Sequence, residues 1–78
     1  MVRMLKRHRS LTSFGLAVCR AREAKGFTQE RLAERADLDS TYISGIERGV
    51  RNASLLSLVR VAKGLGMPLA RLCEGMDA

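Results

Sequence analysis

Apolar residues recur along the chain with the three- and four-residue spacing of α-helices, in segments separated by glycine, proline or short polar stretches. Gly26 and Gly66 stand where helices commonly end, and Pro68 stands where a helix commonly begins. We therefore expect a compact all-α fold of five helices. They are predicted over about residues 13–25, 29–36, 40–48, 55–65 and 68–73.

The second and third of these helices form a pair with a turn of only two residues between them, Asp37 and Leu38. Thr28 and Asp39 stand directly before the two helices, where a side-chain oxygen can accept hydrogen bonds from free N–H groups. The turn would often need a positive φ angle, which Asp tolerates better than most residues. This pattern predicts a helix-turn-helix. Its inner apolar positions are Leu32, Ala33, Ala36, Ile43 and Ile46.

The face of the third helix opposite its isoleucines is small and polar. Short hydroxyl side chains and an arginine suit the major groove of DNA, where such groups meet base edges. Gly45 on this face either permits a close approach to DNA or is simply tolerated. At roughly 100° per residue, the residues that share the face are Thr41, Ser44, Gly45 and Arg48.

Three polar residues outside this face are further candidates for DNA contact. Gln29 lies in the first turn of the second helix, where N–H groups attract phosphate, and its amide can donate to phosphate or reach a base. The other interpretation is a plain surface glutamine. Arg51 and Asn52 follow the third helix in a loop, from which both can contact the sugar-phosphate backbone and Arg51 can reach a guanine edge.

Arg22 and Glu47 border the inner faces of the first and third helices. A half-buried arginine needs a partner, because burial of an unpaired charge is costly. We expect the two side chains to form an ion pair that joins the first helix to the third. This role is structural and not catalytic.

Composition changes this picture little. The net charge is +6, from 14 Lys and Arg against 8 Asp and Glu. Four of the cations and none of the acids lie in the first nine residues, so the rest of the chain holds ten cations and eight acids. Residues 1–12 are predicted to be a basic, flexible arm ahead of a domain over 13–78. The arm either lies on DNA or is a solvated tail.

No pattern in the sequence indicates catalysis, a cofactor or a metal. Cys19, Cys73 and His8 are too few and too far apart for a metal site, and the thiols are expected to be reduced. A chain this short, without a nucleophile–base arrangement or a phosphate-binding glycine loop, is not expected to be an enzyme. No apolar run could span a membrane, and no signal-peptide core follows the basic start, so we expect a cytoplasmic protein.

Apolar residues are crowded in the last quarter of the chain, more than a small five-helix domain can easily bury. We expect some of them to form the seam of a two-fold homodimer. The other interpretation is that they close the core beneath the first helix. The residues assigned to the seam are Leu65, Met67, Leu69, Leu72 and Met76.

The segment GFTQERLAERADLDSTYISGIERG resembles the Xre and lambda-repressor-like helix-turn-helix family. The segment TYISGIERGVRNASLLSL is similar, more specifically, to the small controller proteins of bacterial restriction–modification systems. The resemblance covers about residues 13–73. Asp37 stands where the family most often has Gly, and Ala53 stands where Pro often precedes the serine cap.

The resemblance implies a role for each candidate residue. In the family, the first helix of the motif lies on the DNA backbone and the second enters the major groove. The Arg22–Glu47 pair also matches the family pattern. Residues implied to contact DNA are Gln29, Ser40, Thr41, Tyr42 and Ser44, supported by Arg48, Arg51 and Asn52.

The resemblance also implies a function. Controller proteins bind as dimers to repeated operators beside their own promoter, activate transcription of their own and the endonuclease gene, and repress it at higher occupancy. This places the protein at operator sites in the bacterial nucleoid. Activation needs a surface for RNA polymerase, for which Glu30 and Glu34 on the second helix are our hypothesis. A phage- or plasmid-type repressor, an antitoxin, or a protein-interaction module of the same fold remain alternatives.

Overall fold

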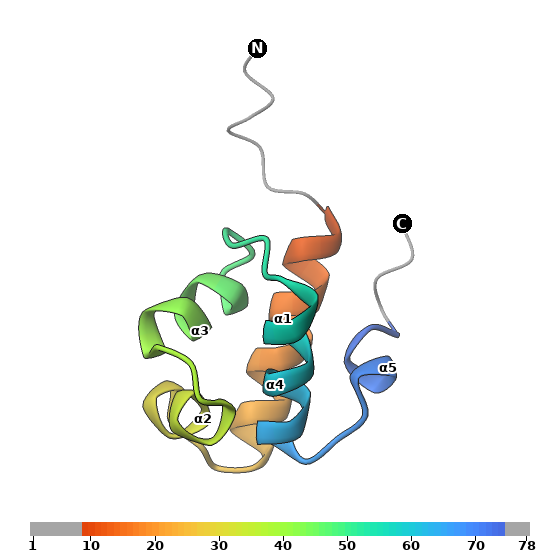
Figure 1. Ribbon diagram of the computed structural model, residues 1–78. Helices are drawn as coiled ribbons and strands as arrows, with labels where there is room; N and C mark the ends of the chain where they lie inside the picture. The colour runs from red at the N-terminus through yellow and green to blue at the C-terminus, as the bar shows by residue number, and fades with distance from the viewer. Residues whose placement is uncertain (1–8, 75–78) are drawn as a thin grey trace.

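The computed structural model describes residues 9–74. These residues form five helices and no strand, which confirms the expected all-α class. Figure 1 shows α1 and α4 in the middle of the molecule, with α2 and α3 on one side of them and α5 on the other. The helices are α1 (Arg9–Ala24), α2 (Gln29–Ala36), α3 (Ser40–Glu47), α4 (Leu55–Leu65) and α5 (Leu69–Leu72).

The first helix begins at Arg9, four residues before the expected start. Its first turn is held by tertiary contacts that helical spacing does not reveal. A Cβ placed on Gly49, in the turn after α3, would lie 2.9 Å from Thr12 Cα, so this turn packs tightly against α1. Residues 9–12 therefore belong to α1 rather than to the arm, whose remaining residues 1–8 lie outside the described part of the chain.

Side chains at the predicted positions cap the helices of the motif. Thr28 Oγ1 accepts from Arg31 N at 3.0 Å, and Asp39 Oδ1 accepts from Thr41 N at 2.7 Å. Asp37 has a φ of 59°, the left-handed conformation that the turn was expected to require. The helix-turn-helix is thus formed by the local signals that predicted it.

The core lies between the four longer helices, with α2 packed mainly against α4 and α3 against α1. All five inner positions of the motif are at most 3% exposed. The buried apolar residues that form one cluster are Phe14, Val18, Leu32, Ala33, Ile43, Ile46, Val61, Ala62, Leu65 and Leu72.

Two residues assigned to the dimer seam belong to this core instead. Leu65 and Leu72 are 0% and 2% exposed in the single chain, so neither can contribute to a surface. Met67 and Leu69 are half-buried and pack against the same cluster. The expected seam was wrong for the two leucines because α5 folds back and covers them. Met76 lies outside the described residues.

Two glycines allow the helices to approach closely. A Cβ on Gly15 of α1 would clash with Ile46 O and would lie 2.7 Å from Glu47 O, at the end of α3. A Cβ on Gly64 of α4 would lie 3.2 Å from Ala36 N in α2. Each half of the motif therefore rests on a neighbouring helix through a position that has no room for a side chain.

Candidate nucleic-acid interface

The third helix presents its polar face at the edge of the molecule (Figure 1). Ile43 and Ile46 are 0% and 2% exposed on its inner side. Thr41 and Arg48 are exposed, whereas Ser40 and Ser44 are half-buried. This arrangement leaves hydroxyl and guanidinium groups facing solvent on a helix that the core holds from behind.

Gly45 does not lie open on that face as the helical spacing predicted. It is buried, because the loop after α3 folds back over it. Val50 N donates to Gly45 O at 3.0 Å, and the nearest side-chain atoms to a Cβ at this position belong to Arg51 and Val50. The expectation that Gly45 faces DNA is thus corrected.

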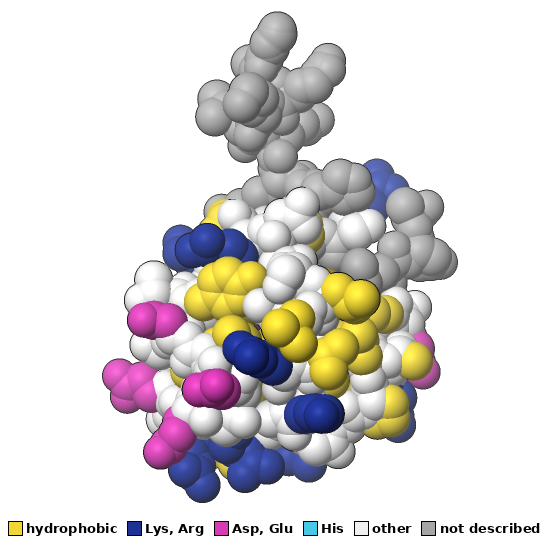
Figure 2. Space-filling view, viewed as in Figure 1, with side chains coloured by type: hydrophobic (Ala, Val, Ile, Leu, Met, Phe, Trp, Pro, Cys, Tyr) yellow, Lys and Arg dark blue, Asp and Glu magenta, His cyan; other side chains and the backbone are white. Residues whose placement is uncertain are grey.

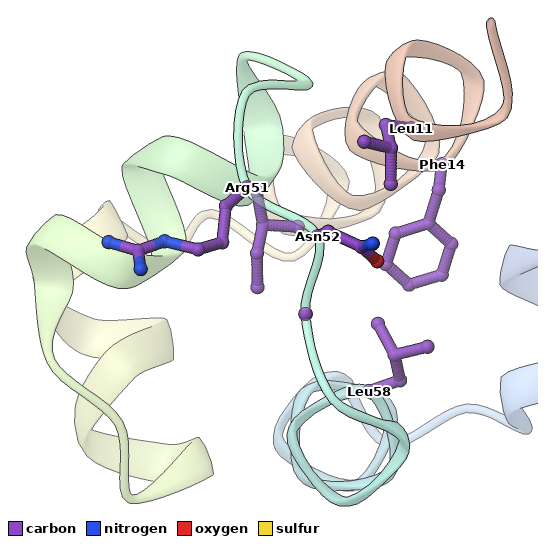
Figure 3. A pocket seen from close by; sticks show the side chains of 7 residues that line it. Leu11, Phe14, Arg51, Asn52 and Leu58 are labelled. Carbon is purple, nitrogen blue, oxygen red and sulfur yellow. The ribbon is translucent and has the colours of Figure 1, made fainter. Parts of the chain in front are cut away.

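The loop after α3 directs its two polar side chains in opposite directions (Figure 3). Arg51 extends along α3, and its guanidinium carbon lies 4.8 Å from the ring centroid of Tyr42, a cation–π distance. Asn52 points the other way, over a small apolar pocket whose lining includes Phe14 and Leu58. Arg51 therefore extends the polar face of α3, whereas Asn52 lies closer to α1.

A buried ion pair joins this interface to the first helix, as the sequence predicted. Arg22 Nε donates to Glu47 Oε2 at 2.6 Å and Nη2 donates to Oε1 at 3.1 Å, so the contact is bidentate. The side chains are only 13% and 4% exposed. Arg22 Nη1 also donates to Phe27 O at 2.8 Å, which ties in the entry to α2.

Gln29 is connected to the same carboxylate. Its Nε2 donates to Glu47 Oε1 at 2.9 Å, so the first residue of α2 and the last residue of α3 share a hydrogen bond. The sequence did not predict this contact, because helical spacing does not relate residues on different helices. Glu47 thus accepts from Arg22 and Gln29 and holds α1, α2 and α3 together.

The electrostatics of this cluster follow from the pair. Its hydrogen bond to Glu47 raises the pKa of Arg22 against the opposing effect of burial, so the guanidinium stays charged. Arg22 Nη2 also lies 3.7 Å from Cys19 Sγ. Burial, and then the charge of Glu47, raises the pKa of the Cys19 thiol, which keeps it protonated at neutral pH.

Asp39 sets the charge at the start of the recognition helix. The hydrogen bond from Thr41 N lowers the pKa of the Asp39 carboxyl, because it stabilises the ionised form. The ionised carboxylate also lies at the end of α3 where N–H groups carry partial positive charge. It follows that this cap is charged at neutral pH.

Within residues 9–74, no three His, Cys, Asp or Glu side chains are grouped so that they could hold a metal ion. In the same part of the chain, no helix has both the length and the apolar character needed to cross a membrane.

Comparison with known proteins identifies the motif. A helix-turn-helix family model matches residues 20–72. Control protein C.MunI of Mycoplasma sp is 43% identical over 56 residues, which cover 72% of this chain and 76% of that protein. The crystal structure of the restriction–modification controller protein C.AhdI from Aeromonas hydrophila is similar with a TM-score of 0.81 and 38% identity, covering 83% of this chain and 98% of that one.

A further similar structure is the C.Esp1396I controller protein tetramer in complex with its natural 35-base-pair operator. It has a TM-score of 0.80 and 39% identity, and the match covers 88% of this chain and 91% of that one. The capped helix pair and the outward polar face of α3 define the class of helix-turn-helix DNA-binding regulators. The chain belongs to the helix-turn-helix family, in the group of restriction–modification controller proteins.

The ion pair predicts how stability responds to substitution at Glu47. Glu47→Ala leaves the buried Arg22 guanidinium with the Phe27 carbonyl but no carboxylate, which we expect to cost about 3–5 kcal/mol of unfolding free energy. Glu47→Gln retains an acceptor oxygen and should cost less. Urea unfolding at fixed protein concentration measures both.

Glu34→Ala is the matched control, because Glu34 pairs with Arg31 at 2.8 Å on the surface, where the two side chains are 71% and 53% exposed. An exposed pair of this kind contributes little, so the control should unfold almost as the unaltered protein does. Similar small losses for Glu47→Ala and Glu34→Ala would contradict the assigned role of the buried pair.

Proposed function

We propose that this protein is the autoregulatory controller of a restriction–modification system. In this role it binds operator DNA beside its own promoter, activates transcription of its own and the endonuclease gene, and represses it at higher occupancy. The observation that carries the proposal is the exposed polar face of α3 on a capped helix-turn-helix. The names of the similar proteins, control protein C.MunI and the operator-bound C.Esp1396I tetramer, support it.

The proposed contacts divide between base edges and backbone. Thr41 and Ser44 lie on the outward face of α3 and are assigned to base edges, with Ser40 and Tyr42 beside them. Gln29 donates one amide hydrogen to Glu47, and an amide carries two, so the second is available for a phosphate. Arg48, Arg51 and Asn52 complete the set in supporting roles.

The polar face of α3 should give the protein sequence-specific affinity for DNA. We expect it to bind its own upstream DNA on the order of 10³-fold or more tightly than scrambled DNA of equal length. Thr41→Ala combined with Ser44→Ala should lower only the specific affinity, because hydroxyls that meet base edges do not contribute to phosphate attraction. Fluorescence anisotropy titrations at several salt concentrations measure both affinities.

Lys63→Ala serves as the control in these titrations, since Lys63 is an exposed cation near the end of α4, on a different helix from the polar face. This variant should keep its specific affinity. Equal and steeply salt-dependent binding to both DNAs would show that only the net positive charge acts, and the proposal would be wrong.

We also propose that the protein binds DNA as a homodimer, with a seam at the start of α4. Leu55 and Leu56 are 70% and 60% exposed, and Figure 2 shows hydrophobic side chains gathered on the face over α4. Such exposed apolar groups are commonly covered by a partner. A two-fold dimer would present two α3 helices to half-sites about 34–36 Å apart.

Leu55→Asp tests the proposed seam. A carboxylate in an apolar two-fold contact meets its own copy, so the variant should sediment as a monomer and lose most of its operator affinity at the same concentration. Leu16→Asp is the matched control, because Leu16 is 46% exposed on α1 and is not assigned to the seam. A Leu55→Asp variant that still sediments as a dimer would rule out this seam.

For activation we propose that Glu30 and Glu34 on α2 contact RNA polymerase. Both are exposed, and Figure 2 shows acidic side chains gathered on the α2 side of the molecule. Exposed acids beside a DNA-binding face are repelled by phosphate, so a role toward a protein partner suits them better.

Glu30→Gln combined with Glu34→Gln should abolish activation of transcription in vitro and leave operator affinity unchanged or slightly raised. Glu23→Gln, at an exposed acid on α1, is the control and should retain activation. Loss of activation and operator affinity together would refute the assignment, because it would show that these acids serve DNA binding or folding.

A further inference from the structure

Gly45 is the residue of α3 whose surroundings the DNA-binding role alone does not explain. A Cβ at this position would lie 3.3 Å from Arg51 Cβ, 3.7 Å from Arg51 Nε and 3.9 Å from Val50 Cγ2. These atoms all belong to the loop after α3. Gly45 therefore makes room for this loop, in contrast to Gly15 and Gly64, which make room for the backbone of another helix.

The loop is also bonded to α3 at this point. Val50 N donates to Gly45 O at 3.0 Å, which brings the following residue, Arg51, alongside the helix. From there the Arg51 guanidinium reaches the ring of Tyr42, three residues before Gly45 on α3, with 4.8 Å between its carbon and the ring centroid. Figure 3 shows the Arg51 side chain extended in this direction.

We propose that Gly45 is a positioning residue for sequence recognition, which seats Arg51 on the ring of Tyr42 at the edge of the α3 face. The proposal rests on the DNA-binding function proposed above. An arginine that reads a guanine edge needs a fixed plane, because two parallel hydrogen bonds must meet O6 and N7 together. The Tyr42 ring supports that plane from one side, and the bare Gly45 backbone lets the Arg51 stem lie flat.

Neither a close approach to DNA nor a requirement of folding accounts for this glycine as well. A glycine that admits the DNA backbone would be exposed, whereas Gly45 is buried beneath the loop. A glycine needed for folding would face the core or have a positive φ angle. Gly45 has neither property, since it lies inside α3 and its close neighbours are loop atoms. Alanine is also the better helix former, so the helix itself gains nothing from glycine here.

Gly45→Ala is therefore expected to separate recognition from stability. Its unfolding midpoint should equal or exceed that of the unaltered protein, and its affinity for scrambled DNA should not change. Its affinity for the upstream DNA should fall about tenfold, the scale of a lost bidentate contact to a base. In an Arg51→Ala background the same substitution should have no further effect on affinity, because Gly45 acts through Arg51.

A spectroscopic measurement tests the seating of Arg51 without DNA. Tyr42 is the single tyrosine of the chain, and the chain has no tryptophan. The Arg51 side-chain protons should therefore show upfield ring-current shifts in NMR spectra that Tyr42→Leu removes. Gly45→Ala should move the same signals toward their values in an unstructured peptide.

The results of these experiments separate the positioning role from the function on which it rests. If the unaltered protein binds upstream and scrambled DNA alike, the proposed function is wrong. If it discriminates between them and Gly45→Ala discriminates equally well, the positioning role is wrong. A lowered unfolding midpoint for Gly45→Ala would assign the glycine to folding, and an undiminished effect in the Arg51→Ala background would assign it to a route other than Arg51. Either result overturns the proposal.

Discussion

The bidentate ion pair between Arg22 and Glu47 is the interaction on which the rest of the structure depends. Both side chains are taken out of water, so each needs the other to remain charged at acceptable cost. The pair forms only because Gly15 lets α1 approach the end of α3, and the same carboxylate accepts from Gln29 at the start of α2. One acidic residue thus fixes three helices relative to one another.

This constraint matters for function because the two motif helices are short. α2 and α3 have eight residues each, well below the length at which an isolated helix is stable in water. Their caps satisfy the free N–H groups at each start, but tertiary packing must supply the remaining stability. The polar face of α3 is therefore as rigid as the core and the ion pair beneath it, which is what base-edge contacts require.

The DNA-binding surface extends beyond the helix-turn-helix into the loop that follows it. This loop places Arg51 beside α3 and Asn52 toward α1, and it leads directly to the exposed leucines at the start of α4. Recognition and the proposed dimer seam are therefore adjacent along the chain. A shift of this loop would alter both, which couples half-site recognition to the spacing between the two copies in the proposed dimer.

Local signals in the sequence by themselves determined the five helices, the two caps, the left-handed turn at Asp37 and the class of the protein, because each depends on residues a few positions apart. The Arg22–Glu47 pair was also predictable, since a bordering arginine needs an acid. Only the tertiary structure decided that Leu65 and Leu72 are core residues and that Gly45 lies beneath a loop. Burial and packing depend on which helices meet, and helical spacing alone does not specify that.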